Sequence, residues 1–252
     1  MNTYEAVETF HLVFLRHFAP TVGPGTVCLK GGVNLRLYHG SPRLSEDMDF
    51  DARVVGVEVL RKNVRKVLES RPLRTELAAA GIGLVAATGA KQTSTVQRWK
   101  CQLLHEEVAL ATRLEFSRRG AGEFEECAVE PPSAALLAER KMAPFVFPHF
   151  TARAAYRQKV RALAARTQVQ ARDVFDLHHL SGSAGCASGV EADLASRAIS
   201  QLGMITFAIF YEQVVPFLPS DLAAFYGTPE AWTTMVERVR RDLARAAETA
   251  QS

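Results

Sequence analysis

The sequence predicts an α+β protein, in which a mixed sheet with flanking helices is followed by a C-terminal helical half. Short apolar runs with strand-like alternation and glycine turns fill the first half of the chain. Helical spacing of apolar residues dominates after the pair Pro131-Pro132. A length of 252 residues can hold one large domain or two small ones. We therefore expect an α/β domain over residues 1–130 and a helical domain over residues 131–252.

The first elements lead to a pair of glycines, Gly31 and Gly32. Glycine tolerates positive φ and lets the backbone approach a ligand closely. A helix that starts directly after such a turn offers unpaired N–H groups and a positive dipole end to phosphate. The expected elements up to this point are a helix over residues 3–19, a strand over 26–30 and a helix over 33–38.

The next predicted strand, over residues 45–51, alternates acidic and apolar side chains. Its period of two places Asp47 and Asp49 side by side on one face, with Met48 and Phe50 on the other. Two ionised carboxylates this close repel unless a cation or water separates them. Magnesium is commonly bound by one or two carboxylates together with phosphate oxygens and water. The alternative is that these aspartates form the solvated face of an edge strand.

The remaining elements follow from periodicity and turn residues, and Ser133 is a plausible helix N-cap. A glycine-rich, charged stretch over residues 118–126 predicts a mobile hairpin or loop. The expected elements are a helix over 56–70, strands over 82–88, 95–104 and 108–117, and helices over 133–144, 151–165, 170–181, 190–202, 204–216 and 229–248.

Four motifs in order then resemble those of a known family. The segment KGGVNLRLYHGSPRLSEDMDFD is similar to the signature of the AbiEii/AbiGii (MenT-like) nucleotidyltransferase toxins of bacterial type IV toxin–antitoxin systems. The family pattern runs GG-x-x-L-R and then R-x-S-x-D-x-D. The positions that match are Gly31, Gly32, Leu35, Arg36, Arg43, Ser45, Asp47 and Asp49.

Two later stretches also resemble family motifs, so the resemblance covers about residues 25–180. ERKMAPF points to Lys141 on a helix, and ARDVFDLHHL points to Asp173 and Asp176, of which Asp173 is the preferred functional residue. The departures from the family pattern are Val33, where a small polar residue is common, and Pro144 soon after the lysine.

The resemblance implies a DNA polymerase β-like nucleotidyltransferase fold with its active site between the two halves. It implies transfer of a nucleotide from an NTP to an RNA acceptor, with the 3′ end of tRNA as a specific candidate, and a cognate antitoxin encoded nearby. Asp47, Asp49 and, from a neighbouring strand, Glu115 would bind one or two Mg²⁺ ions, although Glu115 equally fits an exposed strand position. The catalytic residues would be Asp47, Asp49, Lys141 and Asp173, and the nucleotide would be bound by Gly31, Gly32, Arg36, Ser45 and Lys141.

Other functions stay open at this point. The same fold could modify a protein or a small molecule, or the chain could be a non-catalytic NTP-binding interaction protein. Basic clusters over residues 151–172 and 237–245 fit either a nucleic-acid contact, as in a helical DNA-binding regulator, or solvated helix faces.

Composition predicts the cellular setting. No apolar run reaches the length of a membrane span, and the acidic, amphipathic start argues against a signal peptide. We therefore expect a cytoplasmic protein without a membrane partner. The four cysteines are scattered, so neither a zinc site nor a disulfide framework is expected, and Cys28 is predicted to be a buried apolar residue.

Overall fold

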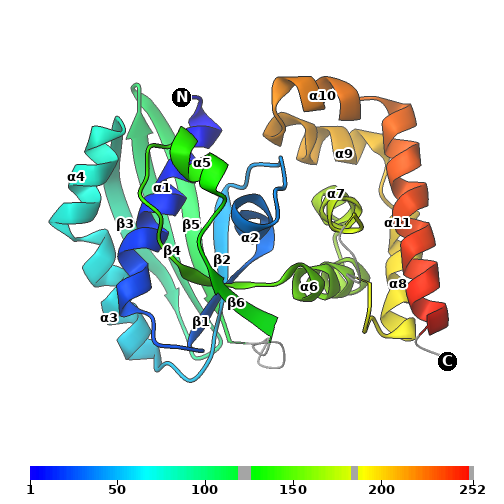
Figure 1. Ribbon diagram of the computed structural model, residues 1–252, viewed down its shortest axis with the longest axis horizontal. Coiled ribbons are helices and arrows are strands. Elements are labelled where there is room, and N and C mark those ends of the chain that lie inside the picture. Colours follow the sequence, from blue (N-terminus) through cyan, green and yellow to red (C-terminus); the bar gives the residue numbers. More distant parts are fainter. Residues whose placement is uncertain (119–125, 183–186, 250–252) are drawn as a thin grey trace. The chain divides into compact units, whose positions relative to one another are not determined.

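The computed structural model describes residues 1–118, 126–182 and 187–249, which form two compact units (Figure 1). The sheet unit consists of residues 1–40 and 44–150. The helical unit consists of residues 41–43 and the chain from Thr151 onward. The division therefore falls at residue 150 and not at residue 130, because a last strand of the sheet follows the segment at which the boundary was expected. Most of the expected loop over 118–126 lies outside the described residues.

Within the described residues, the sheet unit is built on a seven-stranded mixed sheet with the order β3-β4-β5-β2-β1-β7-β6. The β1–β7 and β2–β5 pairs are parallel, and the other neighbours are antiparallel. The strands are β1 (Val27–Lys30), β2 (Asp47–Ala52), β3 (Ile82–Gln92), β4 (Val96–His105), β5 (Val108–Ser117), β6 (Cys127–Glu130) and β7 (Phe147–Phe150).

One face of the sheet is covered by helices, as Figure 1 shows for α1, α3 and α4 beside β3–β5. This face carries the apolar half of each alternating strand, and Phe50 lies at its centre in contact with Phe14, Phe18, Phe116 and Phe147. The opposite face carries the polar half. The helices of this unit are α1 (Thr3–Phe18), α2 (Gly31–Tyr38), α3 (Val57–Leu68), α4 (Arg71–Ala79) and α5 (Ala134–Glu139).

The helical unit has its own buried core, in which Phe175, Phe210 and Trp232 lie near one another. Its helices are α6 (Ala152–Ala165), α7 (Ala171–Leu180), α8 (Ala192–Leu202), α9 (Phe207–Gln213), α10 (Ser220–Tyr226) and α11 (Pro229–Thr249).

Two expected helices were wrong in detail, and three further elements were not expected. The helix expected over 56–70 is two helices, because Ser70 caps a new helix by accepting a hydrogen bond from the Leu73 N–H at 3.4 Å. The helix expected over 133–144 ends at Glu139, so Lys141 lies in a turn. The short strands β6 and β7 and the helix α10 were not expected, because each is too short for its periodicity to show.

The cysteine prediction was half right. Cys28 is fully buried, as expected, but it forms a disulfide with Cys127, 99 residues later, which links β1 to β6. The sheet brings the two Cα atoms to 6.5 Å, within the usual range for a disulfide. Sequence spacing could not predict this pair, since β6 itself was not expected. Among the described residues, Cys101 is a free, buried thiol.

The helices of the described residues were compared with the length and hydropathy that a membrane-spanning helix needs. No single helix there is both long and apolar enough to cross a bilayer. A bent pair, Ala192–Leu202 with Phe207–Phe217, meets the criterion jointly, by length and composition alone.

The central position of Phe50 makes it a test of the sheet unit's packing. We expect Phe50→Ala to lower the free energy of unfolding by about 3–5 kcal/mol, because it leaves a cavity among four aromatic rings. Phe225→Ala is the matched control, since that ring is 65% exposed. Urea denaturation followed by tryptophan fluorescence measures both, and equal losses would contradict this packing.

Candidate active site

The two predicted metal-binding aspartates lie on the polar face of β2. Met48 and Phe50 are fully buried on the other face, so the alternation expected from the sequence is confirmed. Asp49 pairs in register with Lys30 of β1 on one side and Glu115 of β5 on the other. Asp47 pairs with Arg113 of β5. The three acidic residues named as metal ligands therefore share one face of two adjacent strands.

Gly31 brings the glycine turn directly against this carboxylate pair. Its φ is +72°, a left-handed value that glycine adopts without cost. A Cβ placed on Gly31 would lie 2.9 Å from Oδ2 of Asp49 and 3.4 Å from its Cβ. The backbone can approach Asp49 this closely because residue 31 has no side chain.

The glycine pair also starts a helix. Gly31 and Gly32 are the first two residues of α2, two positions earlier than expected, and the N-cap residue Lys30 makes no side-chain cap. The first N–H groups of α2 consequently have no side-chain cap at the helix start. Ser45 lies just before β2, where its hydroxyl donates to the backbone carbonyl of Asp47 at 3.1 Å.

Arginines hold the carboxylates of Asp47 and Glu115. Nε of Arg113 donates to Oδ2 of Asp47 at 3.0 Å, and Nε of Arg98 donates to Oε2 of Glu115 at 2.7 Å. The hydrogen bond to Asp47 is the main cause of the raised pKa of Arg113. In residues 1–118, 126–182 and 187–249, no three His, Cys, Asp or Glu side chains converge closely enough to hold a metal ion. The structure thus brings Asp47 and Asp49 together on one strand but directs Glu115 to an arginine.

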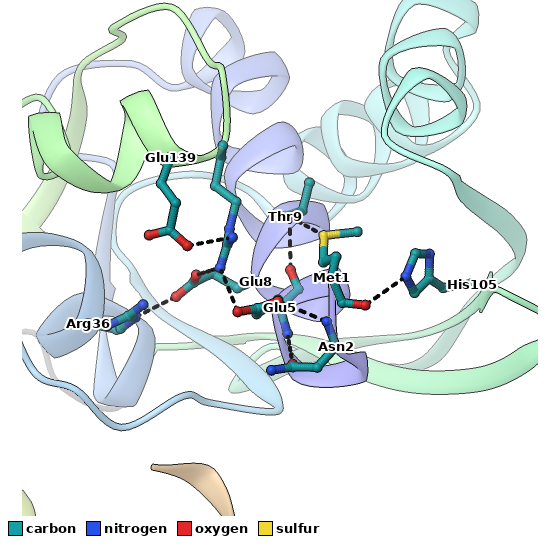
Figure 2. A network of polar contacts seen from close by, with 9 residues as sticks. Met1, Asn2, Glu5, Glu8, Thr9, Arg36, His105 and Glu139 are labelled. Carbon is teal, nitrogen blue, oxygen red and sulfur yellow. Dashed lines mark hydrogen bonds and ion pairs between the residues drawn. The ribbon is translucent and has the colours of Figure 1, made fainter. Parts of the chain in front are cut away.

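Arg36, which the family motif suggested for nucleotide binding, is part of a buried ion-pair network. Its Nε donates to Oε2 of Glu8 in α1 at 2.6 Å (Figure 2). Arg140 donates to the other oxygen of Glu8 at 2.9 Å and to Glu139 at 2.8 Å. Glu8 is 4% exposed, so this network links α1, α2 and the end of α5 inside the sheet unit.

Lys141 was predicted to lie on a helix, and this prediction was wrong. The residue is exposed, in the turn that follows α5, and has a φ of +53°. Left-handed backbone at a residue with a side chain costs about 1–2 kcal/mol, and such positions are often functional.

Asp173 and Asp176 lie in a buried charge cluster of the helical unit. Both carboxylates are fully buried. Nζ of Lys159 lies 2.9 Å from Asp173 and 2.7 Å from Asp176, and Nε of Arg166 donates to Asp173 at 2.7 Å. A nucleotide would contact the Asp173 carboxylate only after displacing Lys159 and Arg166 from it. The expected role of Asp173 in the nucleotide pocket therefore gains no support from its surroundings.

Arg43 completes this buried charge cluster from the segment that precedes β2. Its guanidinium donates to both oxygens of Asp176, at 3.0 and 2.9 Å, and it is 4% exposed. Burial alone would raise the pKa of Asp176, but Arg43 and Lys159 together lower it to about 2. Likewise, burial would lower the pKa of Lys159, and the two aspartates raise it. Asp176 and Lys159 are therefore both charged at neutral pH.

The comparisons with known proteins agree with the motifs. The family model described as "Nucleotidyl transferase AbiEii toxin, Type IV TA system" matches residues 14–245. The chain belongs to this family. It is therefore a nucleotidyltransferase of a toxin family, which implies a cognate antitoxin. No curated protein is significantly similar to the chain in sequence.

Two solved structures share the fold of this AbiEii protein. JHP933 from Helicobacter pylori superposes with a TM-score of 0.61 at 18% identity, over 100% of this chain and 97% of that one. A candidate nucleotidyltransferase from H. pylori superposes with a TM-score of 0.62 at 19% identity, over 97% and 98% of the two chains. At this identity the likeness concerns the fold alone.

Sequence reasoning missed the partners of the acidic residues. Arg43 matched the family motif but had no role assigned to it. Arg113 lies two residues before Glu115, on the same face of β5. Lys159 gave no signal beyond its place in a basic cluster. That cluster was expected to face solvent or nucleic acid, yet Lys159 and Arg166 bind Asp173.

The Gly31 contact predicts a position-specific effect of a methyl group. We expect Gly31→Ala to reduce nucleotide transfer at least tenfold, because the added Cβ displaces the Asp49 carboxylate. Gly25→Ala is the matched control, since its φ is +66° and nothing lies within 4 Å of an added Cβ. Both variants carry a similar backbone cost of about 1–2 kcal/mol in unfolding experiments. Equal transfer rates for the two variants would show that the contact is unimportant.

The buried pair of Arg43 and Asp176 predicts a large stability effect. Arg43→Ala should lower the free energy of unfolding by about 3–5 kcal/mol, because it leaves Asp176 partly uncompensated in the interior. Arg197→Ala removes an exposed helix pair with Asp193 and should cost less than about 1 kcal/mol. Denaturant unfolding at pH 7 compares them, and a loss below 1 kcal/mol for Arg43→Ala would disprove the anchoring role.

Proposed function

We propose that this AbiEii-family enzyme transfers a nucleotide from an NTP to an RNA acceptor, with the 3′ end of tRNA as the specific candidate, and thereby inhibits growth. The observation that carries the proposal is the close approach of Gly31 to Asp49. It supports the proposal because the start of α2, whose N–H groups would bind phosphate, lies beside Asp49, which together with Asp47 would bind the accompanying cation.

The donor set fits Mg²⁺. Asp47 and Asp49 supply two carboxylates on one strand face, and this metal usually takes its remaining ligands from phosphate and water. When bound, the ion would neutralise phosphate charge and polarise the attacking hydroxyl. Arg113 holds Asp47 in the structure, so Asp47 would exchange this partner for the cation. A third ligand from Glu115 stays a prediction, which requires release from Arg98.

The chain's own groups would orient the nucleotide. The N–H groups of Gly31 and Gly32 would donate to the triphosphate. Ser45 would position the entry to β2 through its bond to Asp47, and its hydroxyl could also meet a phosphate. Lys141, on its exposed turn, would neutralise the charge of the leaving pyrophosphate. For Arg36 we propose an indirect effect through Glu8, and for Asp173 an indirect effect through Lys159.

Several finer assignments belong to the same proposal. The order of glycine turn, helix and acidic strand supports a DNA polymerase β-like nucleotidyltransferase fold. NTP and RNA as substrates support action in the cytoplasm, where the Cys28–Cys127 bond would be exposed to reducing conditions. The cognate antitoxin would be encoded nearby.

Label transfer from α-labelled NTPs to total RNA tests the proposal. We expect Asp49→Asn and Lys141→Ala to lose at least 100-fold in transfer, because they remove a metal ligand and a charge that stabilises the transition state. Asp221→Asn, an exposed acid in the helical unit, should transfer normally. Thermal unfolding of each variant separates loss of chemistry from loss of fold.

Treatment of the labelled product with RNase and with protease identifies the acceptor. Label that is released by RNase and resists protease supports the RNA assignment. Undiminished transfer by both Asp49→Asn and Lys141→Ala would refute the site, and label released by protease would refute the acceptor.

A further inference from the structure

The polar face of the sheet continues beyond the carboxylates as a surface rich in basic side chains. We propose that this surface docks the phosphate backbone of the acceptor RNA. The proposal rests on the function proposed above and specifies where that substrate binds. We call the surface the basic strip, and it consists of Lys91 on β3, Arg98 and Lys100 on β4, and Arg113 on β5.

Strand register places the basic strip next to the site. One row across the sheet runs from Lys91 to Arg98, Glu115 and Asp49. The next row runs from Thr88 to Lys100, Arg113 and Asp47. Both rows reach the aspartates of β2, and paired residues on neighbouring strands point to the same face. The basic strip and the carboxylates are therefore parts of one continuous surface.

This surface is open within the described structure. The residues that alternate with the strip, such as Trp99, Leu114 and Phe116, are buried on the helix-covered face. Lys91 and Lys100 are exposed, and neither forms an ion pair in the described part of the chain. The side chains of Arg113 and Arg98 are 48% and 33% exposed. Lys91 and Lys100 can therefore contact phosphate without breaking an ion pair. Arg98 and Arg113 are paired with the neighbouring carboxylates.

The dimensions suit a chain of nucleotides. Neighbouring strands are about 4.8 Å apart, so the backbone at Lys91 lies roughly 14 Å from that at Asp49, three strands away. Stacked nucleotides advance about 3.4 Å each, so the strip spans about four of them. An acceptor whose end is held at the carboxylates would extend over the strip. Its repeating negative charge is complementary to the exposed lysines.

Other basic groups suit this role less well. Lys159 and Arg166 are committed to Asp173 in the interior of the helical unit. Lys62 and Lys66 are exposed, but they lie on α3, which covers the opposite face of the sheet. These two lysines therefore provide a matched control of equal charge.

Salt-dependent binding tests the strip without any requirement for catalysis. The probe is total tRNA, titrated with the Lys91→Ser/Lys100→Ser variant and with the Lys62→Ser/Lys66→Ser control. We expect the strip variant to bind on the order of tenfold more weakly at 0.1 M salt, with the slope of log K against log salt reduced by roughly 1.4 for two lost phosphate contacts. The control should match the parent protein.

Kinetics then separate this proposal from the proposed function. In the transfer assay, the strip variant should have a raised KM for RNA and an unchanged KM for NTP. If Asp49→Asn abolishes transfer but the strip variant binds RNA with normal affinity, the docking surface is overturned and the proposed function stands. Equal loss of binding in the control variant would also overturn the docking surface. If no RNA is labelled but binding still depends on the two lysines, the function fails and the docking surface stands.

Discussion

The contact between the Gly31 backbone and the Asp49 carboxylate is the constraint on which the rest of the site depends. A left-handed residue without a side chain lets α2 begin at the end of β1, directly beside β2. A side chain at residue 31 would collide with the Asp49 carboxylate and displace it. The turn from β1 into α2 therefore sets the first N–H groups of α2 beside the Asp49 carboxylate. The proposed function rests on this proximity.

A second constraint lies in the helical unit. Arg43, Asp173 and Asp176 are buried and Lys159 is partly buried, and each lies against groups of opposite charge. Asp173 and Asp176, which match a family motif, thus have charged partners inside the helical unit. A motif can be retained in a family for the segment that it anchors as well as for the reaction that it assists.

Sequence reasoning worked where the pattern was periodic and local. The alternation of Asp47, Met48, Asp49 and Phe50 predicted the strand and its buried face, and the glycine pair predicted a turn into a helix. It failed where the determinant was a partner distant in the chain. The pairing of Cys28 with Cys127, of Arg36 with Glu8 and of Arg113 with Asp47 depends on which strands and helices become neighbours. Short elements such as β7 are fixed by the sheet that they join and have no periodicity of their own.

The placement of residues 41–43 has a consequence for how the chain is made. This segment belongs to the helical unit, and its anchor Asp176 lies 133 residues after Arg43. At translation speeds of about 5–20 residues per second, roughly 7–27 s pass between the synthesis of the two residues. During that interval Arg43 lacks its carboxylate partner Asp176. The nascent toxin can therefore complete this connection only after α7 has emerged from the ribosome.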